Sequence, residues 1–395
     1  MPKRELFPMS IFFDGHNDSF VKCYPPRHLR TSPLNRHAFV KGCPQAHIDL
    51  PRALQAGYLG ALCAIFIDPP LGEESTCLQA HNREVAPGRQ PDLEPPLDHQ
   101  VALAATLEVM SHIFQDERIT DGFKVVRSYQ ELVDTMSHKQ LAVVIHLEGC
   151  EAIDVNLEAL ETLYQAGVRS LGICWSRPNI FGTGVPFAYK VHPNTGPGLT
   201  AAGLALVKRC DELGIMLDAA HLNAQGFFDL AQASERRPLV VSHSSAFTLC
   251  PASRALTDEQ LETVAAHRGL VGVTMHVPDL IGPRGQELTY IPSAEQLYTN
   301  FKQSRRKLLN HSQQANSLNE LEAVIAHIVY IGKQIGFDHV ALGSDFDGCL
   351  IPDQIKDVTN LNLIADGLRQ AGLKEKELEK VLYKNWLRVL QESWL

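Results

Sequence analysis

The sequence lacks several features that would each indicate a class of protein. It contains no run of about 18 consecutive apolar residues, the length that a membrane-spanning helix needs. It has no block of lysine and arginine, and its formal net charge is −9, so we expect no nucleic-acid partner. The stretch before the first apolar run is too short for the apolar core of a signal peptide. We therefore expect a cytoplasmic protein with no membrane partner.

The nine cysteines lack any Cys-x-x-Cys spacing, so a structural zinc site built on cysteines is not expected. Their number is odd, and several lie inside apolar runs, as Cys63 does in residues 61–66. These features indicate buried thiols in a reducing compartment rather than a disulfide framework.

Short apolar runs rich in β-forming residues are what the sequence does contain, and amphipathic patterns separate them. Near-continuous apolar character is typical of parallel strands that are buried on both faces. We expect strands at residues 11–14, 60–68, 141–148, 170–175, 215–220, 238–243, 270–276 and 339–345. We expect helices at residues 156–166, 200–213, 257–267, 318–335 and 374–394.

This alternation over 395 residues predicts an α/β fold, a (β/α)8 TIM-type barrel forming one catalytic domain over residues 1–395. A doubly wound sheet is the alternative, but no glycine-rich dinucleotide fingerprint follows the first strand. Two segments rich in proline and glycine fit the alternation poorly. Residues 69–106 predict a surface insertion, and residues 181–199 predict a long active-site loop.

Polar side chains of metal-binding type follow five of the predicted strands. Because the C-terminal ends of barrel strands face one pocket, these side chains are expected to converge. His16 and Asp18 are two residues apart, so on a strand they point to the same side. The residues at the other strand ends are His146 and Glu148, Asp218 and His221, His243, and Asp345 and Asp347.

A site for two metal ions would satisfy these groups, which are costly to bury without a metal or a partner. His16 and Asp18 would bind one ion, and His221 and His243 the other. Glu148 would bridge both ions with its two oxygens. Two such ions about 3.5–4 Å apart acidify a shared water. The alternatives are a salt-bridged His16–Asp18 pair and histidines satisfied within the core.

Four further residues at these strand ends have open or structural roles. Asp345 and Asp347 share a side of the chain, so by spacing alone either could handle the proton. We interpret His146 and Asp218 as structural.

The sequence resembles the membrane (renal) dipeptidase family, which consists of zinc-dependent metallopeptidases of the amidohydrolase-type barrel superfamily. The match keeps its order from about residue 11 to the C-terminus. The matching stretches are Asp14-Gly15-His16-Asn17-Asp18, Leu147-Glu148-Gly149, Asp218-Ala219-Ala220-His221, Val241-Ser242-His243-Ser244-Ser245-Ala246, Ser253-Arg254, Gly343-Ser344-Asp345-Phe346-Asp347-Gly348 and Asn385-Trp386-Leu387-Arg388-Val389.

The resemblance implies a zinc-dependent dipeptidase that hydrolyses short peptides by a metal-bridging hydroxide. Dipeptides are the implied substrates, including those with a C-terminal D-residue. Asp345 is implied as the catalytic acid/base and Arg254 as a clamp on the substrate carboxylate, whose shape its planar fork matches. The implied ligands of two Zn²⁺ ions per chain are His16, Asp18, Glu148, His221 and His243.

The sequence departs from the family at Trp175. Members closest to the mammalian enzymes carry a histidine here that contacts the substrate, and this chain has Cys174-Trp175-Ser176-Arg177. Trp175 can pack against a substrate and donate from its indole N–H, but it cannot replace an imidazole. Two alternatives therefore stay open: another amidohydrolase-type hydrolase acting on a non-dipeptide amide or ester, and a repurposed non-peptidase barrel. The sequence leaves a homo-oligomer open.

Overall fold

The computed structural model describes residues 10–68, 92–234, 236–282, 291–310 and 318–394. Their strands form one sheet in the order β1-β2-β4-β5-β6-β7-β8-β9, with β3 pairing to β4 outside this path, and every pairing is parallel. The strands are β1 (Phe12–Asn17), β2 (Tyr58–Ile65), β3 (Phe123–Val125), β4 (Leu141–Glu148), β5 (Val168–Gly172), β6 (Met216–Asp218), β7 (Val240–Ser244), β8 (Leu270–Val273) and β9 (Val340–Leu342).

The path closes into a ring between β1 and the chain that follows β9. The Asp345 N–H donates to the His16 carbonyl at 2.9 Å, and the Asp18 N–H donates to the Phe346 carbonyl at 2.8 Å. The fold is therefore the predicted (β/α)8 TIM-type barrel, and each of the eight predicted strands is present. β3 was not predicted, because three residues of Phe-Lys-Val carry too little periodicity. β1 also extends to Asn17, so His16 lies within the strand and not beyond its end as predicted.

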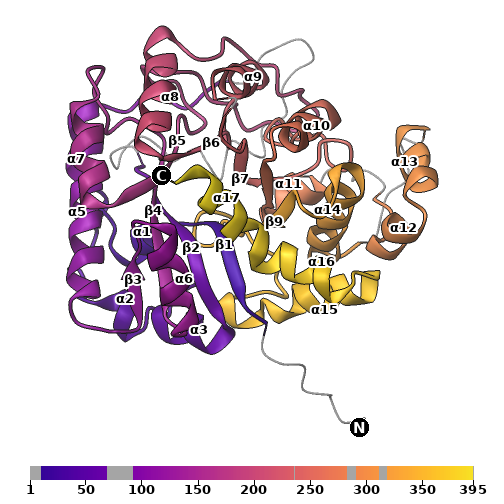
Figure 1. Ribbon diagram of the computed structural model, residues 1–395, viewed down its shortest axis with the longest axis horizontal. Coiled ribbons are helices and arrows are strands. Elements are labelled where there is room, and N and C mark those ends of the chain that lie inside the picture. Colours follow the sequence, from indigo (N-terminus) through magenta and orange to yellow (C-terminus); the bar gives the residue numbers. More distant parts are fainter. Residues whose placement is uncertain (1–9, 69–91, 235, 283–290, 311–317, 395) are drawn as a thin grey trace.

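Helices surround the strands (Figure 1). Their ends follow the expected capping residues: Thr200 and Gly214 bound α8, and Thr257 with Gln260 forms the predicted capping box of α10. The helices are α1 (Ser19–Cys23), α2 (Ala38–Lys41), α3 (Leu50–Ala56), α5 (His99–Glu117), α6 (Tyr129–Ser137), α7 (Glu158–Ala166), α8 (Ala201–Leu213), α9 (Ala224–Ala233), α10 (Asp258–Ala266), α11 (Val277–Ile281), α12 (Ala294–Thr299), α13 (Phe301–Asn310), α14 (Glu320–Ile335), α15 (Asn362–Ala371), α16 (Glu375–Glu379) and α17 (Asn385–Ser393).

The N-terminal end of the barrel is apolar and is closed by α17, which is yellow in Figure 1. Trp386 of this helix is fully buried, stacks on Phe13 at 5.9 Å between ring centroids, and donates its indole N–H to the Leu342 carbonyl at 2.8 Å. Inward-facing side chains of the strands, among them Leu62 and Val144, pack in the same cluster. Polar side chains are thus left to the opposite end, where the predicted site residues lie.

Two segments were predicted to interrupt the regular alternation. Of residues 69–106, the part from 69 to 91 lies outside the described residues, and α5 begins at His99. Residues 181–199 connect β5 to α8 with isolated bridges and no helix or strand, as a long loop would.

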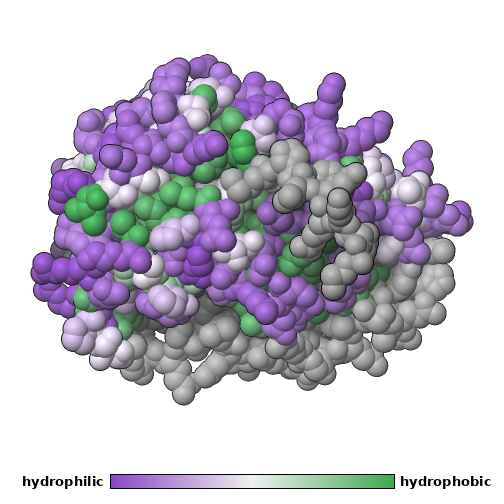
Figure 2. Space-filling view, turned by 90° about the horizontal axis from the view of Figure 1, so that it is seen from below, coloured by the Kyte–Doolittle hydropathy of each residue, from purple (hydrophilic) through white to green (hydrophobic). Residues whose placement is uncertain are grey.

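The molecular surface seen in Figure 2 is mainly hydrophilic, with hydrophobic residues in small groups. None of the helices in the described ranges is long and apolar enough to cross a bilayer.

Candidate active site

A pocket opens at the C-terminal ends of the strands. Six of the eight predicted site residues line it: Asp18, Glu148, Trp175, His221, Arg254 and Asp345. The other two, His16 and His243, lie against Glu148 and are buried. The structure therefore brings together side chains from β1, β4, β7 and the segments after β5, β6, β7 and β9, as the barrel hypothesis required.

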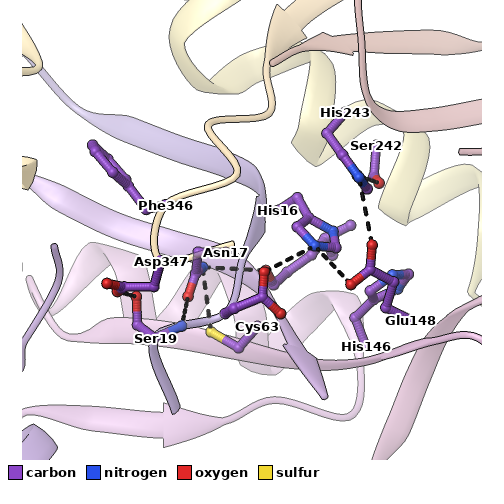
Figure 3. Close-up of polar contacts among 12 residues, drawn as sticks. His16, Asn17, Ser19, Cys63, His146, Glu148, Ser242, His243, Phe346 and Asp347 are labelled. Carbon is purple, nitrogen blue, oxygen red and sulfur yellow. Dashed lines mark hydrogen bonds and ion pairs between the residues drawn. The ribbon is translucent and has the colours of Figure 1, made fainter. Parts of the chain in front are cut away.

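Glu148 lies between the histidines, with one carboxylate oxygen directed to each side (Figure 3). Its Oε2 is 3.5 Å from His16 Nε2. Its Oε1 is 3.0 Å from His221 Nε2 and 3.5 Å from His243 Nε2. Asp18 approaches from the other side of His16, with Oδ2 at 3.6 Å from Nε2. This is the arrangement that a carboxylate bridging two ions needs.

Several buried polar atoms of this cluster lack hydrogen-bond partners within the described part of the chain. They include both ring nitrogens of His16 and Oδ1 of Asp18. Such atoms are costly unless a ligand satisfies them. Two groups have ligand atoms close enough to share an ion: His16, Glu148 and His243, and His16, Asp18 and Asp345. The nitrogen and oxygen donors suit zinc, so the residues fit a metal centre.

The hydrogen bonds of His243 determine which ring nitrogen it presents to the pocket. Ser242 Oγ lies 2.5 Å from Asp218 Oδ2 and 2.8 Å from His243 Nδ1. The single hydroxyl proton goes to the carboxylate, so the hydroxyl must accept from Nδ1–H. The lone pair of His243 is therefore on Nε2, which faces Glu148. His221 is similar, with Nδ1 at 2.9 Å from Ser176 Oγ.

The electrostatics keep two of the histidines neutral and Glu148 charged. Burial, followed by Arg254, lowers the pKa of His221 to about 3, and burial and His16 lower the pKa of His243 well below its usual value. Neutral imidazole is the form that binds a metal. Burial alone would raise the pKa of Glu148, but His16 and His221 together outweigh burial and hold this pKa well below the ordinary value. Glu148 thus stabilises positive charge at the centre of the cluster.

Asp345 belongs to the segment after β9 and lines the pocket. Burial raises its pKa to about 6, so the carboxyl can exchange a proton near neutral pH. Its backbone is left-handed, with φ at 61°, and Gly348 approaches closely: a Cβ at Gly348 would lie 2.4 Å from Asp345 Oδ1 and 2.2 Å from Asp18 Oδ2. Asp347, the alternative by spacing, instead accepts from Ser19 Oγ and the His47 N–H at 2.6 and 2.7 Å, which is a structural role.

Arg254 is 7% exposed and reaches the cluster around Glu148 from the segment after β7. Its Nη2 lies 3.0 Å from His221 Nε2 and donates to the His243 carbonyl at 3.3 Å. Its Nε is buried without a partner among the described residues, so a donor is available for an anionic group.

His146 and Asp218, which we interpreted from the sequence as structural, are both buried beside the cluster. His146 Nδ1 is 2.9 Å from Ser170 Oγ, and Asp218 accepts from the backbone and side chain of Ser242. Asp218 nevertheless influences the site, because it fixes the proton of the serine that contacts His243.

Six pocket residues were not predicted as site residues from the sequence. Phe66 follows β2, and Phe187 belongs to the long loop after β5. His276, Asp279, Gly348 and Cys349 come from segments after β8 and β9. The position of His276 at the end of a predicted strand and that of Phe187 in the predicted active-site loop were usable signals, whereas nothing in the residue types of Phe66, Asp279 and Cys349 places their side chains in a pocket.

Comparisons with known proteins agree with this geometry. The sequence matches the family described as Membrane dipeptidase (Peptidase family M19) over residues 2–393. The chain belongs to the membrane dipeptidase family. Members are metallopeptidases that act on peptide bonds, so the family resemblance and the enzyme class predicted from the sequence are confirmed.

Solved structures of this family share the fold over nearly the whole chain. A metallo peptidase from Rhodobacter sphaeroides, liganded with a phosphinate mimic of the dipeptide L-Ala-D-Ala, is 34% identical with a TM-score of 0.82, covering 98% of this chain and 100% of that chain. The M19 dipeptidase AC is 33% identical with a TM-score of 0.79, covering 98% and 99%. An uncharacterized protein from the pqqA 5' region of Klebsiella pneumoniae is 38% identical over 256 residues, 65% of this chain and 83% of that protein.

Proposed function

We propose that this member of the family hydrolyses dipeptides with two Zn²⁺ ions per chain. The observation that carries the proposal is the position of Glu148, whose two oxygens face His16 on one side and His221 and His243 on the other. His16 and Asp18 would hold one ion, and His221 and His243 the other. When bound, the ions would supply Lewis acidity that lowers the pKa of a shared water and polarises the peptide carbonyl.

Asp345 is proposed to move the proton. Its raised pKa of about 6 allows it to accept a proton from the attacking water and deliver it to the leaving amine near neutral pH. It lies beside Asp18 at the edge of the pocket, where Gly348, which has no side chain, leaves room for both carboxylates.

Arg254 is proposed to bind the free carboxylate of the substrate. Its buried guanidinium would form charge-assisted hydrogen bonds, and a carboxylate beside the reacting bond is a property of dipeptides. The L-Ala-D-Ala mimic held by the Rhodobacter sphaeroides relative supports substrates with a C-terminal D-residue. A cytoplasmic location is part of the proposal, and the free thiols of the eight described cysteines are compatible with it.

The test is turnover of L,L- and L,D-dipeptides by the zinc-loaded protein and by Asp345→Asn. We expect the wild type to hydrolyse dipeptides and Asp345→Asn to lose about 10²–10⁴-fold in kcat, because general acid–base catalysis contributes on that scale. Equal zinc content in the two proteins is the control. A fully zinc-loaded wild type that cleaves no dipeptide would contradict the proposal. Hydrolysis of acylated amino acids or esters instead would favour another amidohydrolase-type activity.

A further inference from the structure

We propose that Phe66, Trp175 and Phe187 form a subsite for a large apolar or aromatic side chain on the N-terminal residue of the substrate. This inference rests on the proposed dipeptidase function and adds a substrate preference to it. The three residues come from two segments far apart in sequence, and each lines the pocket. They form one continuous aromatic surface, which we call the aromatic wall.

The aromatic wall adjoins the proposed metal ligands. Trp175 is in contact with both phenylalanines, with ring centroids 4.7 Å from Phe66 and 5.4 Å from Phe187. The His221 ring lies 5.8 Å from Trp175 and 6.0 Å from Phe187. Trp175 is 6% exposed, whereas Phe66 and Phe187 are partly exposed in the pocket. A substrate reacting beside His221 would therefore lie within contact distance of the wall.

Arg177 supports the wall from behind without offering a charge to the substrate. Its guanidinium carbon lies 5.2 Å from the ring centroids of both Phe66 and Trp175. The side chain is 1% exposed, and it donates from Nε to Glu151 Oε1 and from Nη2 to the Ile67 carbonyl, each at 2.8 Å. Because the guanidinium is buried and its charge is paired with Glu151, the wall favours apolar side chains over acidic ones.

The order of the strands places the Phe66 end of the wall opposite Arg254, and we infer from this that the wall contacts the N-terminal residue of the substrate. In the ring β1-β2-β4-β5-β6-β7-β8-β9, β2 and β7 are four positions apart and thus opposite each other. Phe66 follows β2, and Arg254 follows β7. A dipeptide whose carboxylate contacts Arg254 and whose peptide bond lies at Glu148 would extend its N-terminal residue toward Phe66. The side chain of the C-terminal residue would lie on the Arg254 side.

The experiment compares two series of dipeptides with the full-length, zinc-loaded protein. One series is Xaa-Ala and the other Ala-Xaa, where Xaa is Gly, Leu, Phe, Asp or Lys. We expect kcat/KM for Phe-Ala and Leu-Ala to exceed that for Gly-Ala by about 10-fold or more, the scale that apolar pockets achieve. Phe66→Ala should reduce the Phe-Ala to Gly-Ala ratio to about threefold or less and leave the Ala-Xaa ratios unchanged.

Two further variants separate this effect from a general loss of structure. Phe66→Leu keeps an apolar side chain. Its ratio of kcat/KM for Phe-Ala to that for Gly-Ala should lie between those of the wild type and Phe66→Ala, and it can be measured even if Phe66→Ala is poorly folded. Phe228→Ala, at a half-buried phenylalanine of α9 outside the pocket, should leave every ratio unchanged. Cleavage without a preference in the Xaa-Ala series, or a preference that Phe66→Ala and Phe66→Leu leave intact, would overturn the subsite alone. No cleavage of any dipeptide by the wild type would overturn the proposed function as well.

Discussion

Single residues around the site determine the chemical form of the metal-binding groups. Ser242 is the clearest case, because its one hydroxyl proton is given to Asp218 and its oxygen accepts from His243 Nδ1. The serine thereby orients the imidazole and keeps its Nε2 lone pair toward Glu148. Partners of this kind commonly affect metal affinity as well as ligand orientation.

We predict that Ser242→Ala weakens zinc binding by about 10–100-fold, the scale found when such supporting hydrogen bonds are removed. The variant leaves His243 Nδ1 and Asp218 Oδ2 without their shared partner, so the imidazole can rotate or change tautomer. Competition with a zinc chelator measures the affinity. Ser176→Ala provides a comparison, since it removes the equivalent contact of His221 alone. Unchanged affinity in Ser242→Ala with an unchanged fold would contradict this role.

The sequence predicted that the residues proposed as metal ligands lie close together, but it did not predict much of their surroundings. His16, Glu148 and His243 could be found because each ends or follows an apolar run, and barrel geometry requires such positions to converge. The left-handed backbone at His221 and Asp345, with φ of 65° and 61°, has no signal in residue type. Phe66 lies at the end of a predicted strand and Phe187 in the predicted active-site loop, but whether their side chains face the pocket depends on tertiary contacts.

At the scale of elements, α14 connects two segments that carry the pocket residues Arg254 and Asp279. Its His327 is fully buried, with Nδ1 accepting from the Ala246 N–H at 3.0 Å and Nε2 at 2.9 Å from the Leu280 carbonyl. These contacts join the segment after β7 to α11 and require the neutral imidazole, since Nδ1 must accept. Burial lowers the pKa of His327 to about 4.

This pKa predicts that acid weakens the attachment of α14. The unfolded chain binds a proton near pH 6.5 and the folded chain only near pH 4, so stability present above pH 6.5 is lost as pH falls toward 4. The contribution of His327 to the free energy of unfolding should fall by about 3 kcal/mol, at 1.36 kcal/mol for each pKa unit. Urea unfolding of the metal-free protein at pH 4 to 7 measures it. His327→Gln should remove this part of the dependence of the free energy of unfolding on pH. His138→Gln, at an exposed histidine, should leave that dependence unchanged.

Helices and strands could be predicted from the local sequence where the hydrophobic pattern and the capping residues extend over many positions. The capping box at Thr257 and Gln260 and the stop at Gly214 predicted helix ends correctly. The C-terminal stretch at 374–394, expected as one or two helices, is helical over nearly its whole length, as α16, a π-helix over Lys380–Lys384 and α17 follow one another directly; only the π-helix was not predicted. A π-helix has no residue signature, because it arises where packing inserts a residue into a regular helix.

At the scale of the whole molecule, the barrel depends on α17 to close its apolar end. Trp386 fits against β1 because Gly15 has no side chain: a Cβ there would lie 2.2 Å from Trp386 Cζ2. The indole also contributes a hydrogen bond to the Leu342 carbonyl. One tryptophan thus joins the last helix to the first and last strands of the ring.

We predict that Trp386→Ala lowers the free energy of unfolding by about 3–5 kcal/mol, as large-to-small changes of buried aromatics do. Trp386→Phe, which loses the hydrogen bond but keeps a ring, should cost less. Urea unfolding of both variants at constant zinc provides the comparison. A loss below about 1 kcal/mol in Trp386→Ala would mean that α17 does not close the barrel.

The most direct test of the account is the zinc content per chain after dialysis against a zinc buffer, measured by mass spectrometry of the metal. Glu148 with an oxygen on each side predicts two ions per wild-type chain, and Glu148→Gln should retain one or none, because an amide cannot bridge with two anionic oxygens. Two ions in the wild type and fewer in the variant would support the binuclear site. One ion or none in a folded wild-type protein would contradict it.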